Sequence, residues 1–282
     1  MTLAHTLIAV FINLLWGSMY IVATIGLQEF PAVLFTAIRF ALLCLLLSIF
    51  IPVPREQVKP LLMVGLLMGV GMYLTLYISL ALAENTASVA VISKLEVPFA
   101  ILLGVVILKE KFGIKRVIGV SIAMIGAVAI TFDPAAIDDL PALFWMTVSA
   151  VFSAYAAIKI RLLQGVSPIT ITAWISLVAA PVLFTTSAIF EWDSWNRVAD
   201  ASWIGWSALI YTAVMSSIVS NSLQYYLLQK YPVSQVAPYM LLSPIFAVAG
   251  GVLFLDDQLT PMLMAGSFLV LLGIGWINYR QD

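Results

Sequence analysis

VAVISKLEVPFAILLGVVILKEKFGIKRVIGVSIAMIG, the stretch from Val89 to Gly126, recurs later in the chain as VAPYMLLSPIFAVAGGVLFLDDQLTPMLMAGSFLVLLG, from Val236 to Gly273. The two stretches align without gaps, and identical residues coincide along them: Phe99 with Phe246, Gly104 with Gly251, Leu108 with Leu255 and Gly119 with Gly266. Pro98 and Pro244 stand one residue out of register. Self-similarity of this length indicates that the chain consists of two copies of one structural unit.

The composition places the chain among membrane proteins. Of its 282 residues, 63% are hydrophobic and only 10% are charged, whereas a soluble domain carries about 25% charged residues. A net charge of −1 makes nucleic acid an unexpected partner. Because His5 and Cys44 are the only histidine and cysteine, an internal disulfide, most zinc sites and histidine-based catalysis are excluded. We therefore predict no metal, no cofactor and no catalytic residue.

Apolar runs between charged or proline-rich breaks predict the membrane-spanning segments. A helix needs about 20 mostly apolar residues to cross the hydrocarbon. Ten runs meet this requirement: Leu3–Leu27, Ala32–Ile51, Leu61–Leu82, Thr86–Leu108, Ile114–Phe132, Pro141–Ile160, Pro168–Phe190, Trp203–Leu228, Ser234–Leu255 and Pro261–Tyr279. The predicted fold is an all-α polytopic membrane protein, one compact bundle of ten transmembrane helices without a soluble domain, and we expect a monomer in the lipid bilayer. Glycines such as Gly119, Gly126, Gly266 and Gly273 are assigned to close helix packing within the bundle, with a dimer interface as the alternative.

Lysine and arginine predict the orientation of the helices. If the N-terminus is cytoplasmic, then the cytoplasmic connections and the C-terminal tail contain Arg55, Lys59, Lys109, Lys111, Lys115, Arg116, Lys159, Arg161, Lys230 and Arg280. The opposite loops contain only Arg197 among many acidic residues. Positive residues gather on the cytoplasmic side in proteins with short loops, so both termini are predicted to be cytoplasmic.

The two copies are expected to be inverted relative to one another. We place the first five-helix repeat at residues 1–136 and the second at residues 137–282. An odd number of spans makes the second repeat enter the membrane from the other side, and the loop charges agree, since LKEKFGIKR is basic where its counterpart LDDQLTPML is acidic. Inverted repeats characterise secondary transporters, whose substrate site lies near the membrane midplane between the halves. A gene duplication without transport is the alternative.

Three stretches resemble the EamA-type half of the drug/metabolite transporter superfamily: NLLWGSMYIV, KLEVPFAILLGVVILKEKFGIKRVIGVSIAMIGA and SQVAPYMLLSPIFAVAGGVLFLDDQLTPMLMAGSFLVLLG. The resemblance covers nearly the whole chain. It implies a ten-helix exporter of metabolites in the bacterial cytoplasmic (inner) membrane, most similar to the branch that exports aromatic and other amino acids. The family's acidic residue after the fourth helix matches Glu110, and Asp257 is a mild departure in the second half. The resemblance fixes no substrate ligand.

Polar and aromatic side chains recur on single faces of several predicted helices. The predicted substrate-pathway residues are Asn13, Trp16, Tyr20, Tyr73, Tyr77, Lys94, Tyr155, Asn221, Tyr225, Tyr239 and Ser243. Spacings of three, four and seven positions place such residues on one helix face, and polar side chains in a bilayer normally face the bundle interior. An aromatic wall with hydroxyl and amide groups suits an amphiphile, and ring faces attract ammonium groups by about 0.5–2 kcal/mol. For any single Tyr or Trp, interfacial anchoring or helix packing is the alternative.

Lys94 and Glu96 are charged residues inside an apolar run, followed closely by Pro98. Each charge costs about 2.5–3.5 kcal/mol at a helix centre, so each needs a partner or a wet cavity. Because residues two apart on a helix point in nearly opposite directions, we expect Glu96 to pair with Arg39, with a direct substrate role as the alternative. Lys94 should then face the passage or extend outward. Pro98, and Pro244 in the corresponding helix, should loosen their helices where a gate can hinge.

These features together predict a secondary transporter. It is expected to export small metabolites, above all amino acids including aromatic ones, by alternating access or facilitated diffusion. The sequence has no Walker-type loop, so direct use of ATP is not expected. A carboxylate held by Arg39 would be a poor proton carrier, which favours facilitated diffusion over proton coupling. The alternatives are a non-transporting membrane scaffold or sensor, and an intramembrane enzyme, for which the convergent acid, base or metal groups are lacking.

Overall fold

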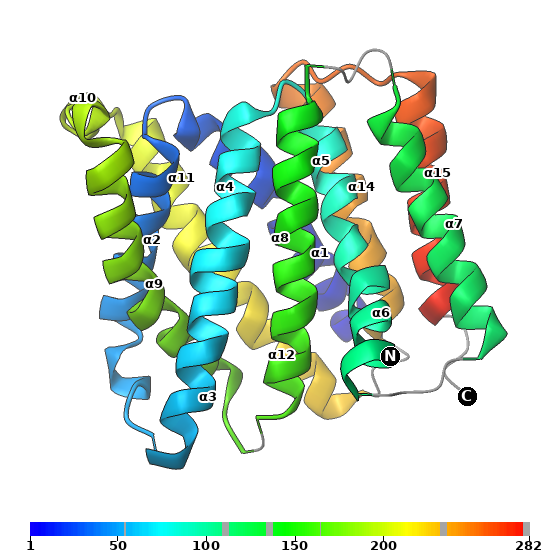
Figure 1. Cartoon of the computed structure of the whole chain (residues 1–282), viewed down its shortest axis with the longest axis horizontal. Coiled ribbons are helices and arrows are strands. Elements are labelled where there is room, and N and C mark those ends of the chain that lie inside the picture. The colour runs from blue at the N-terminus through cyan, green and yellow to red at the C-terminus, as the bar shows by residue number, and fades with distance from the viewer. Residues whose placement is uncertain (54, 109–112, 134–137, 164, 232–235, 279–282) are drawn as a thin grey trace.

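The computed structural model describes residues 1–53, 55–108, 113–133, 138–163, 165–231 and 236–278. Within these residues every regular element is a helix, and no strand is present. The helices stand side by side in one bundle, and the chain begins with α1 (Leu3–Leu27) and finishes with α15 (Pro261–Asn278) at the same end (Figure 1). The all-α architecture predicted from the composition is confirmed.

The helices of the first half are α1, α2 (Ala32–Leu46), η1 (Ser48–Phe50), α3 (Arg55–Gly65), η2 (Leu66–Met72), α4 (Tyr73–Leu82), α5 (Thr86–Ile92), η3 (Ser93–Leu95), α6 (Glu96–Leu108) and α7 (Ile114–Thr131). Those of the second half are α8 (Leu140–Arg161), α9 (Pro168–Phe190), η5 (Trp192–Ser194), α10 (Arg197–Asp200), α11 (Trp203–Ala213), η6 (Val214–Val219), α12 (Ser220–Lys230), η7 (Ala237–Leu241), α14 (Leu242–Phe254) and α15. The predicted boundary between the repeats falls at residues 134–137, outside the described residues.

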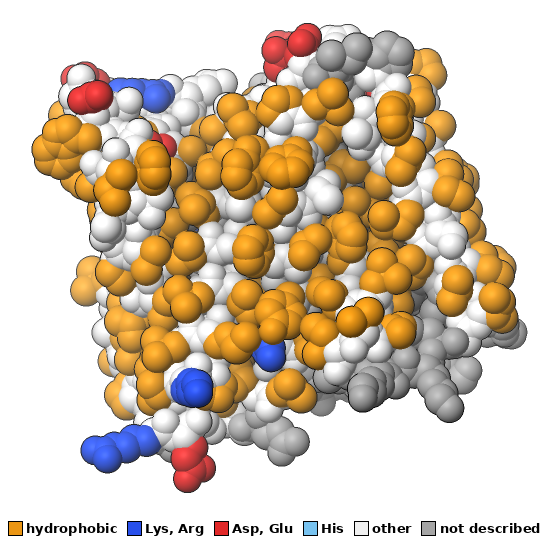
Figure 2. Space-filling model, in the orientation of Figure 1, with side chains coloured by type: hydrophobic (Ala, Val, Ile, Leu, Met, Phe, Trp, Pro, Cys, Tyr) orange, Lys and Arg blue, Asp and Glu red, His pale blue; other side chains and the backbone are white. Residues whose placement is uncertain are grey.

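Six helical segments of the described chain are long and apolar enough to cross a membrane: Leu3–Leu27, Arg55–Leu82, Thr86–Ile107, Leu140–Ile160, Pro168–Phe190 and Trp203–Gln224. Four shorter apolar helices occupy the other predicted spans: Ala32–Leu46, Val117–Thr131, Tyr239–Phe254 and Pro261–Trp276. Apolar side chains cover the middle of the visible face, and charged side chains lie at its two ends (Figure 2). This distribution fits a protein that crosses the bilayer several times, while the full count of ten spans stays a prediction.

Four breaks in the helices fall at matching places in the two halves. The third predicted span of each half contains π-helical turns, η2 and η6, and the fourth contains 3-10 turns, η3 and η7. Pro98 and Pro244 account for η3 and η7, because a proline cannot donate to the carbonyl four residues earlier and its ring clashes with that carbonyl. At the end of η6 the Oγ of Ser220 donates to the carbonyl of Met215 at 2.8 Å. This bond gives a hydrogen-bond partner to a carbonyl of the π-helical turn. The irregularity predicted at Pro98 is therefore present.

The first helix of each half packs on two helices of the other half. In the first half α1 packs on α11 and α14, and in the second half α8 packs in the same way on α4 and α6. The pairs α2 with α9 and α7 with α15 also pack closely, and the helices of each pair run antiparallel (Figure 1). Each of these contacts thus has a counterpart with the halves exchanged, so the two halves pack on one another in a matching pattern.

Glycines allow α7 and α15 to approach closely. A Cβ atom at Gly126 would lie 2.6 Å from the carbonyl oxygen of Gly266, and one at Gly273 would lie 2.5 Å from the carbonyl oxygen of Gly119. Real Cβ atoms essentially never come within 3.0 Å of another atom in this way. The close packing predicted for these glycines is thus present between two helices of one chain.

Candidate substrate cavity

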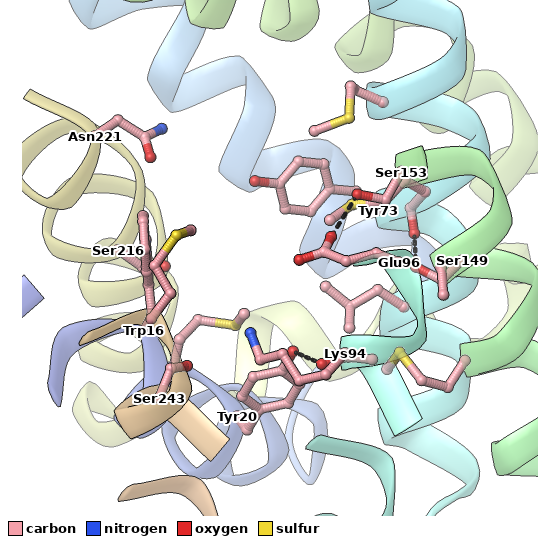
Figure 3. Close-up of a pocket in the computed structure, with 18 residues that line it drawn as sticks. Trp16, Tyr20, Tyr73, Lys94, Glu96, Ser149, Ser153, Ser216, Asn221 and Ser243 are labelled. Atoms are coloured by element: carbon pink, nitrogen blue, oxygen red, sulfur yellow. Dashed lines mark hydrogen bonds between the residues drawn. The ribbon is translucent and has the colours of Figure 1, made fainter. Parts of the chain in front are cut away.

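A cavity of about 220 Å³ lies between the two halves, at the level of the four helical breaks. One water molecule needs about 10–15 Å³ on a comparable scale, so the cavity has room for a small organic molecule. The labelled side chains in Figure 3 surround it from both halves. The residues that line it are Trp16, Met19, Tyr20, Met68, Met72, Tyr73, Leu76, Ser93, Lys94, Glu96, Met146, Ser149, Ala150, Ser153, Ser216, Asn221, Met240 and Ser243.

Each helical break contributes to the wall of this cavity. Met72 comes from η2, Lys94 from η3, Ser216 from η6 and Met240 from η7. The hydroxyl of Ser149 in α8 donates to the carbonyl of Met72 at 2.9 Å, so the π turn of one half is fixed by a side chain of the other. Interrupted helices are tolerated at membrane depth where they are buried in protein or line a cavity, and here they do both.

The following predicted pathway residues line the cavity: Trp16, Tyr20, Tyr73, Lys94, Asn221 and Ser243. Glu96, predicted to have a structural or gating role, lines it as well. Tyr20 is buried, and its hydroxyl donates to the Oγ of Ser93 at 2.8 Å. Ser243 is only 1% exposed, and its hydroxyl has no hydrogen-bond partner among the described residues. That hydroxyl is therefore available to a molecule in the cavity.

Two residues of the predicted helix faces lie outside the cavity. Asn13 is buried in α1, where its side-chain amide donates to the carbonyl of Ala9 at 2.8 Å. Tyr77 is fully buried one turn beyond Tyr73, with the guanidinium carbon of Arg39 5.8 Å from its ring centroid. Helical spacing selects a face of a helix but not a depth along it, which explains why only part of each face reaches the cavity.

The other predicted aromatic residues also lie elsewhere or are not described. The ring of Tyr155 lies 5.2 Å from the ammonium group of Lys159, away from the cavity wall. Tyr239 packs against a small apolar cluster that includes Ile12. The side chain of Tyr225 lies outside the described part of the chain.

Methionine and serine side chains that sequence analysis missed complete the wall: Met19, Met68, Met72, Met146, Met240, Ser93, Ser149, Ser153 and Ser216. In α8, Met146, Ser149 and Ser153 are three and four positions apart, a spacing that could have identified them as one face. Serine gives a weak signal because its hydroxyl often bonds to the backbone of its own helix. Methionine side chains are flexible and polarisable, so they adapt to ligands of different shape.

The predicted ion pair between Arg39 and Glu96 is wrong. Arg39 is 1% exposed, and its Nη2 donates to the carbonyl of Thr212 at 3.2 Å and to the Oγ of Ser217 at 2.5 Å. Its guanidinium carbon lies 4.7 Å from the centroid of the Tyr73 ring, close enough for a cation–π attraction. The two charges have compatible depths, but Arg39 extends from α2 to the π turns of the other half and stabilises those turns instead.

Glu96 and Lys94 both point into the cavity (Figure 3). The Oε2 of Glu96 accepts a hydrogen bond from the Oγ of Ser153 at 2.7 Å, and its Oε1 has no partner among the described residues. Lys94 makes no hydrogen bond and no ion pair within the described ranges of the chain. Neither charge neutralises the other, so the cavity contains a cation and an anion that a bound molecule can contact.

Carboxylates join the two halves at the end of the bundle opposite to the chain termini. We call it the clamped end, and it holds the connections at residues 28–31, 83–85, 191–202 and 255–260 (Figure 1). Glu191 accepts hydrogen bonds from the backbone N–H groups of Val33 at 3.0 Å and Leu34 at 2.9 Å, at the start of α2. Anionic side chains are favourable at such helix N-termini.

Two more carboxylates at the clamped end accept hydrogen bonds from backbone N–H groups of the other half. Asp257 accepts from the N–H groups of Thr86 at 3.2 Å and Ala87 at 2.8 Å, at the start of α5. Glu29 accepts from the N–H of Ser202 at 2.6 Å, before α11. Each of these carboxylates belongs to one half and binds backbone of the other, so this end is held closed.

Burial perturbs two of the clamping carboxyl groups. Desolvation raises the pKa of Asp257 above its ordinary value, and the backbone N–H bonds lower it by less. Desolvation likewise raises the pKa of Asp139, which accepts from the N–H groups of Glu84 and Asn85. Both carboxyl groups therefore bind a proton more readily in this closed arrangement than in water. Glu110, the first-half counterpart of Asp257, lies outside the described residues.

Comparison with known proteins assigns the family. The model of the EamA-like transporter family matches twice, at residues 4–132 and 140–279. A probable amino-acid metabolite efflux pump of Escherichia coli is 24% identical over 279 residues, which cover 96% of this chain and 93% of the pump. The uncharacterized transporter YoaV of Bacillus subtilis is 23% identical over 277 residues, which cover 93% of this chain and 92% of that protein.

The fold is also found among solved structures. A crystal structure of another protein superposes with a TM-score of 0.65 at 16% sequence identity, covering 98% of this chain and 96% of that one. The two family matches account for both halves of the chain, so the resemblance to EamA-type transporters is confirmed, and the protein is a transporter and not an enzyme. With two copies of one helical domain around a shared cavity, the chain belongs to the EamA-like transporter family.

Proposed function

We propose that this protein exports amino acids, aromatic ones among them, across the bacterial cytoplasmic membrane. The observation that carries the proposal is the cavity between the two halves, which combines aromatic rings with an unpaired ammonium and carboxylate. Rings of Trp16 and Tyr73 suit an aromatic or aliphatic side chain, while the polar groups suit a charged head. The efflux pump of Escherichia coli named above, described as acting on amino-acid metabolites, supports this substrate class.

The proposed topology is ten spans in two inverted five-helix repeats, at residues 1–136 and 137–282. The antiparallel pairing of α2 with α9 and of α7 with α15 supports inversion (Figure 1). The distribution of lysine and arginine supports a cytoplasmic location for both termini, which places the clamped end outside. In this arrangement the conformation is closed towards the outside, and export requires the clamped end to open.

Transport by the purified protein in liposomes tests the substrate class. We expect labelled aromatic amino acids to cross vesicles that contain the protein faster than protein-free vesicles. Trp16→Ala, in the cavity wall, should reduce this flux, because the ring is lost from the site. Trp276→Ala is the matched control, since Trp276 is 51% exposed on α15 and lies away from the cavity.

Two outcomes would contradict the proposal. If a broad panel of amino acids and related metabolites leaves the vesicles no faster than lipid alone, the protein is not an amino-acid exporter. If Trp16→Ala and Trp276→Ala have equal effects, the cavity is not the transport site. A cytoplasm-dependent fluorescent reporter fused to the C-terminus checks the orientation, and a dark reporter on that terminus would reverse it.

The driving force is proposed to be the amino-acid gradient itself. Because Arg39 binds Thr212 and Ser217 instead of Glu96, an ion pair with Arg39 does not keep Glu96 from carrying a proton. Initial rates at two values of pH, with and without a proton gradient of either direction, decide the point. A rate that follows the substrate gradient alone supports facilitated diffusion, whereas accumulation driven by a proton gradient refutes it.

A further inference from the structure

A cation and an anion, Lys94 and Glu96, face the same cavity without forming an ion pair with each other. Lys94 in η3 has no polar partner in the described part of the chain, and Glu96 at the start of α6 has one bonded and one free carboxylate oxygen. Charged groups at membrane depth are costly unless they are paired or hydrated. Two opposite charges that face the same cavity without pairing to each other therefore point to a ligand that neutralises both.

We propose that Lys94 and Glu96 form a two-point site for a zwitterion, in which Lys94 binds the α-carboxylate and Glu96 binds the α-ammonium group. This assignment rests on the proposed function and specifies which chemical groups select the substrate. The bond from Ser153 fixes one oxygen of Glu96 and leaves the other directed to the ligand. Charge-assisted hydrogen bonds of this kind are about twice as strong as neutral ones.

The charge balance of the cavity selects against singly charged ligands. Lys94 and Glu96 are the charged residues among those that line it. A monoamine would leave Lys94 without a partner, and a monocarboxylate would leave Glu96 without one of its own. An α-amino acid carries both complementary groups on one carbon atom, so a single small molecule of this class can satisfy both charges.

Ser243 adds a third polar contact. In the alignment of the two halves, Ser243 occupies the position of Glu96, and it lies on the wall opposite to Glu96 (Figure 3). Its hydroxyl is buried and has no partner among the described residues. A buried hydroxyl without a partner is unfavourable, and a polar head held between Lys94 and Glu96 would supply one. The two aligned positions thus differ in charge: Glu96 provides an anion on one wall, and Ser243 provides a neutral hydroxyl on the other.

Binding of three related probes to the full chain in lipid nanodiscs tests this site. The probes are L-phenylalanine, phenethylamine, which lacks the carboxylate, and 3-phenylpropionate, which lacks the ammonium group. At about pH 7 the carboxyl and amino groups of these probes are ionised. We expect L-phenylalanine to bind at least about tenfold more tightly than either analogue, because each analogue loses one charge-assisted contact.

Two variants should change this preference in opposite ways. Lys94→Gln should bring phenethylamine to within about threefold of L-phenylalanine while 3-phenylpropionate stays weak. Glu96→Gln should do the reverse. Lys159→Gln is the matched control, because Lys159 contacts Tyr155 away from the cavity, and it should keep both preferences. Each preference is a ratio measured within one preparation, so partial unfolding of a variant cancels.

The outcomes separate the site from the function. If amino acids cross the vesicles but the wild type binds all three probes equally, the zwitterion site is refuted while the export function stands. If Lys94→Gln weakens L-phenylalanine and phenethylamine by the same factor, Lys94 is a structural group and its assignment is overturned. Absence of both transport and binding for every amino acid tested refutes the site and the proposed function together.

Discussion

Replacing Gly126 by alanine should force α7 and α15 apart. The added Cβ would lie 2.6 Å from the carbonyl oxygen of Gly266 and 2.7 Å from the backbone nitrogen of Val270. Both neighbours are backbone atoms, so neither can rotate away as a side chain would. An ordinary contact begins at 3.4 Å, and 3.4 minus 2.6 gives a separation of about 0.8 Å that the two helices must open.

The expected loss follows from two opposing effects. Overpacking of a close contact costs about 1–3 kcal/mol, whereas glycine to alanine in a helix gains about 1 kcal/mol of helix propensity. The net change in the free energy of unfolding should therefore be a loss of up to about 2 kcal/mol. Helix association in a membrane depends on close packing without a hydrophobic driving force, so the loss is not recovered by burial elsewhere.

Unfolding of the detergent-solubilised protein, followed by tryptophan fluorescence during heating and denaturant titration, measures this change. Gly275→Ala, on the neighbouring helix α15, is the matched control, because its added Cβ would meet only the Cδ1 of Leu241, at 3.5 Å. The control should be neutral or more stable. If Gly126→Ala is as stable as Gly275→Ala, the packing of α7 on α15 is refuted, and a change in molecular mass by light scattering would indicate a dimer interface instead.

Three further changes test the clamped end and the buried arginine. The pKa of Asp257 is raised in the closed conformation, and a conformation with a raised pKa is favoured as pH falls. Acidifying the outer side from about pH 7 to about pH 4 should therefore slow export, and Asp257→Asn should weaken this dependence on pH. Initial rates in vesicles measure both effects, and an Asp257→Asn profile identical to that of the wild type would refute the role of Asp257. Glu191→Gln keeps one acceptor oxygen at the start of α2 and should lower the unfolding free energy by about 0.5–2 kcal/mol, measurable by heating. Arg39→Lys removes the planar donor that reaches both Thr212 and Ser217, so a loss of about 1–3 kcal/mol is expected, and equal stability of the two proteins would rule out this anchoring role.

The general fold was predictable because hydrophobicity and loop charge act along the whole chain. The first predicted span, Leu3–Leu27, has the same bounds as α1. The second was predicted to extend to Ile51, but α2 ends at Leu46 and a 3-10 turn follows. An apolar run shows how much chain can lie in lipid, whereas the end of a helix depends on local backbone bonds. The π turns had no sequence signal comparable to the prolines at η3 and η7.

The site was only partly predictable, because depth and direction come from tertiary packing. Tyr73 and Tyr77 share a face of α4, yet Tyr73 lines the cavity, whereas Tyr77, one turn further along the helix, is buried outside it. Arg39 and Glu96 have compatible depths, but their side chains extend to different partners in the second half. Lys94 was expected at the passage or outside it, and its position in the cavity follows from the 3-10 turn that Pro98 produces.

The aligned connections of the two halves differ in charge. Asp257 binds the start of α5 at the clamped end, whereas the aligned connection of the first half, LKEKFGIKR, is rich in lysine. Carboxylates can cap helix N-termini because the partial charge there is positive. The two aligned connections share a carboxylate, Glu110 and Asp257, but in the first half this carboxylate stands between Lys109 and Lys111, whereas in the second half it stands between Asp256 and Gln258. The two halves therefore share one fold while the charge around this carboxylate differs.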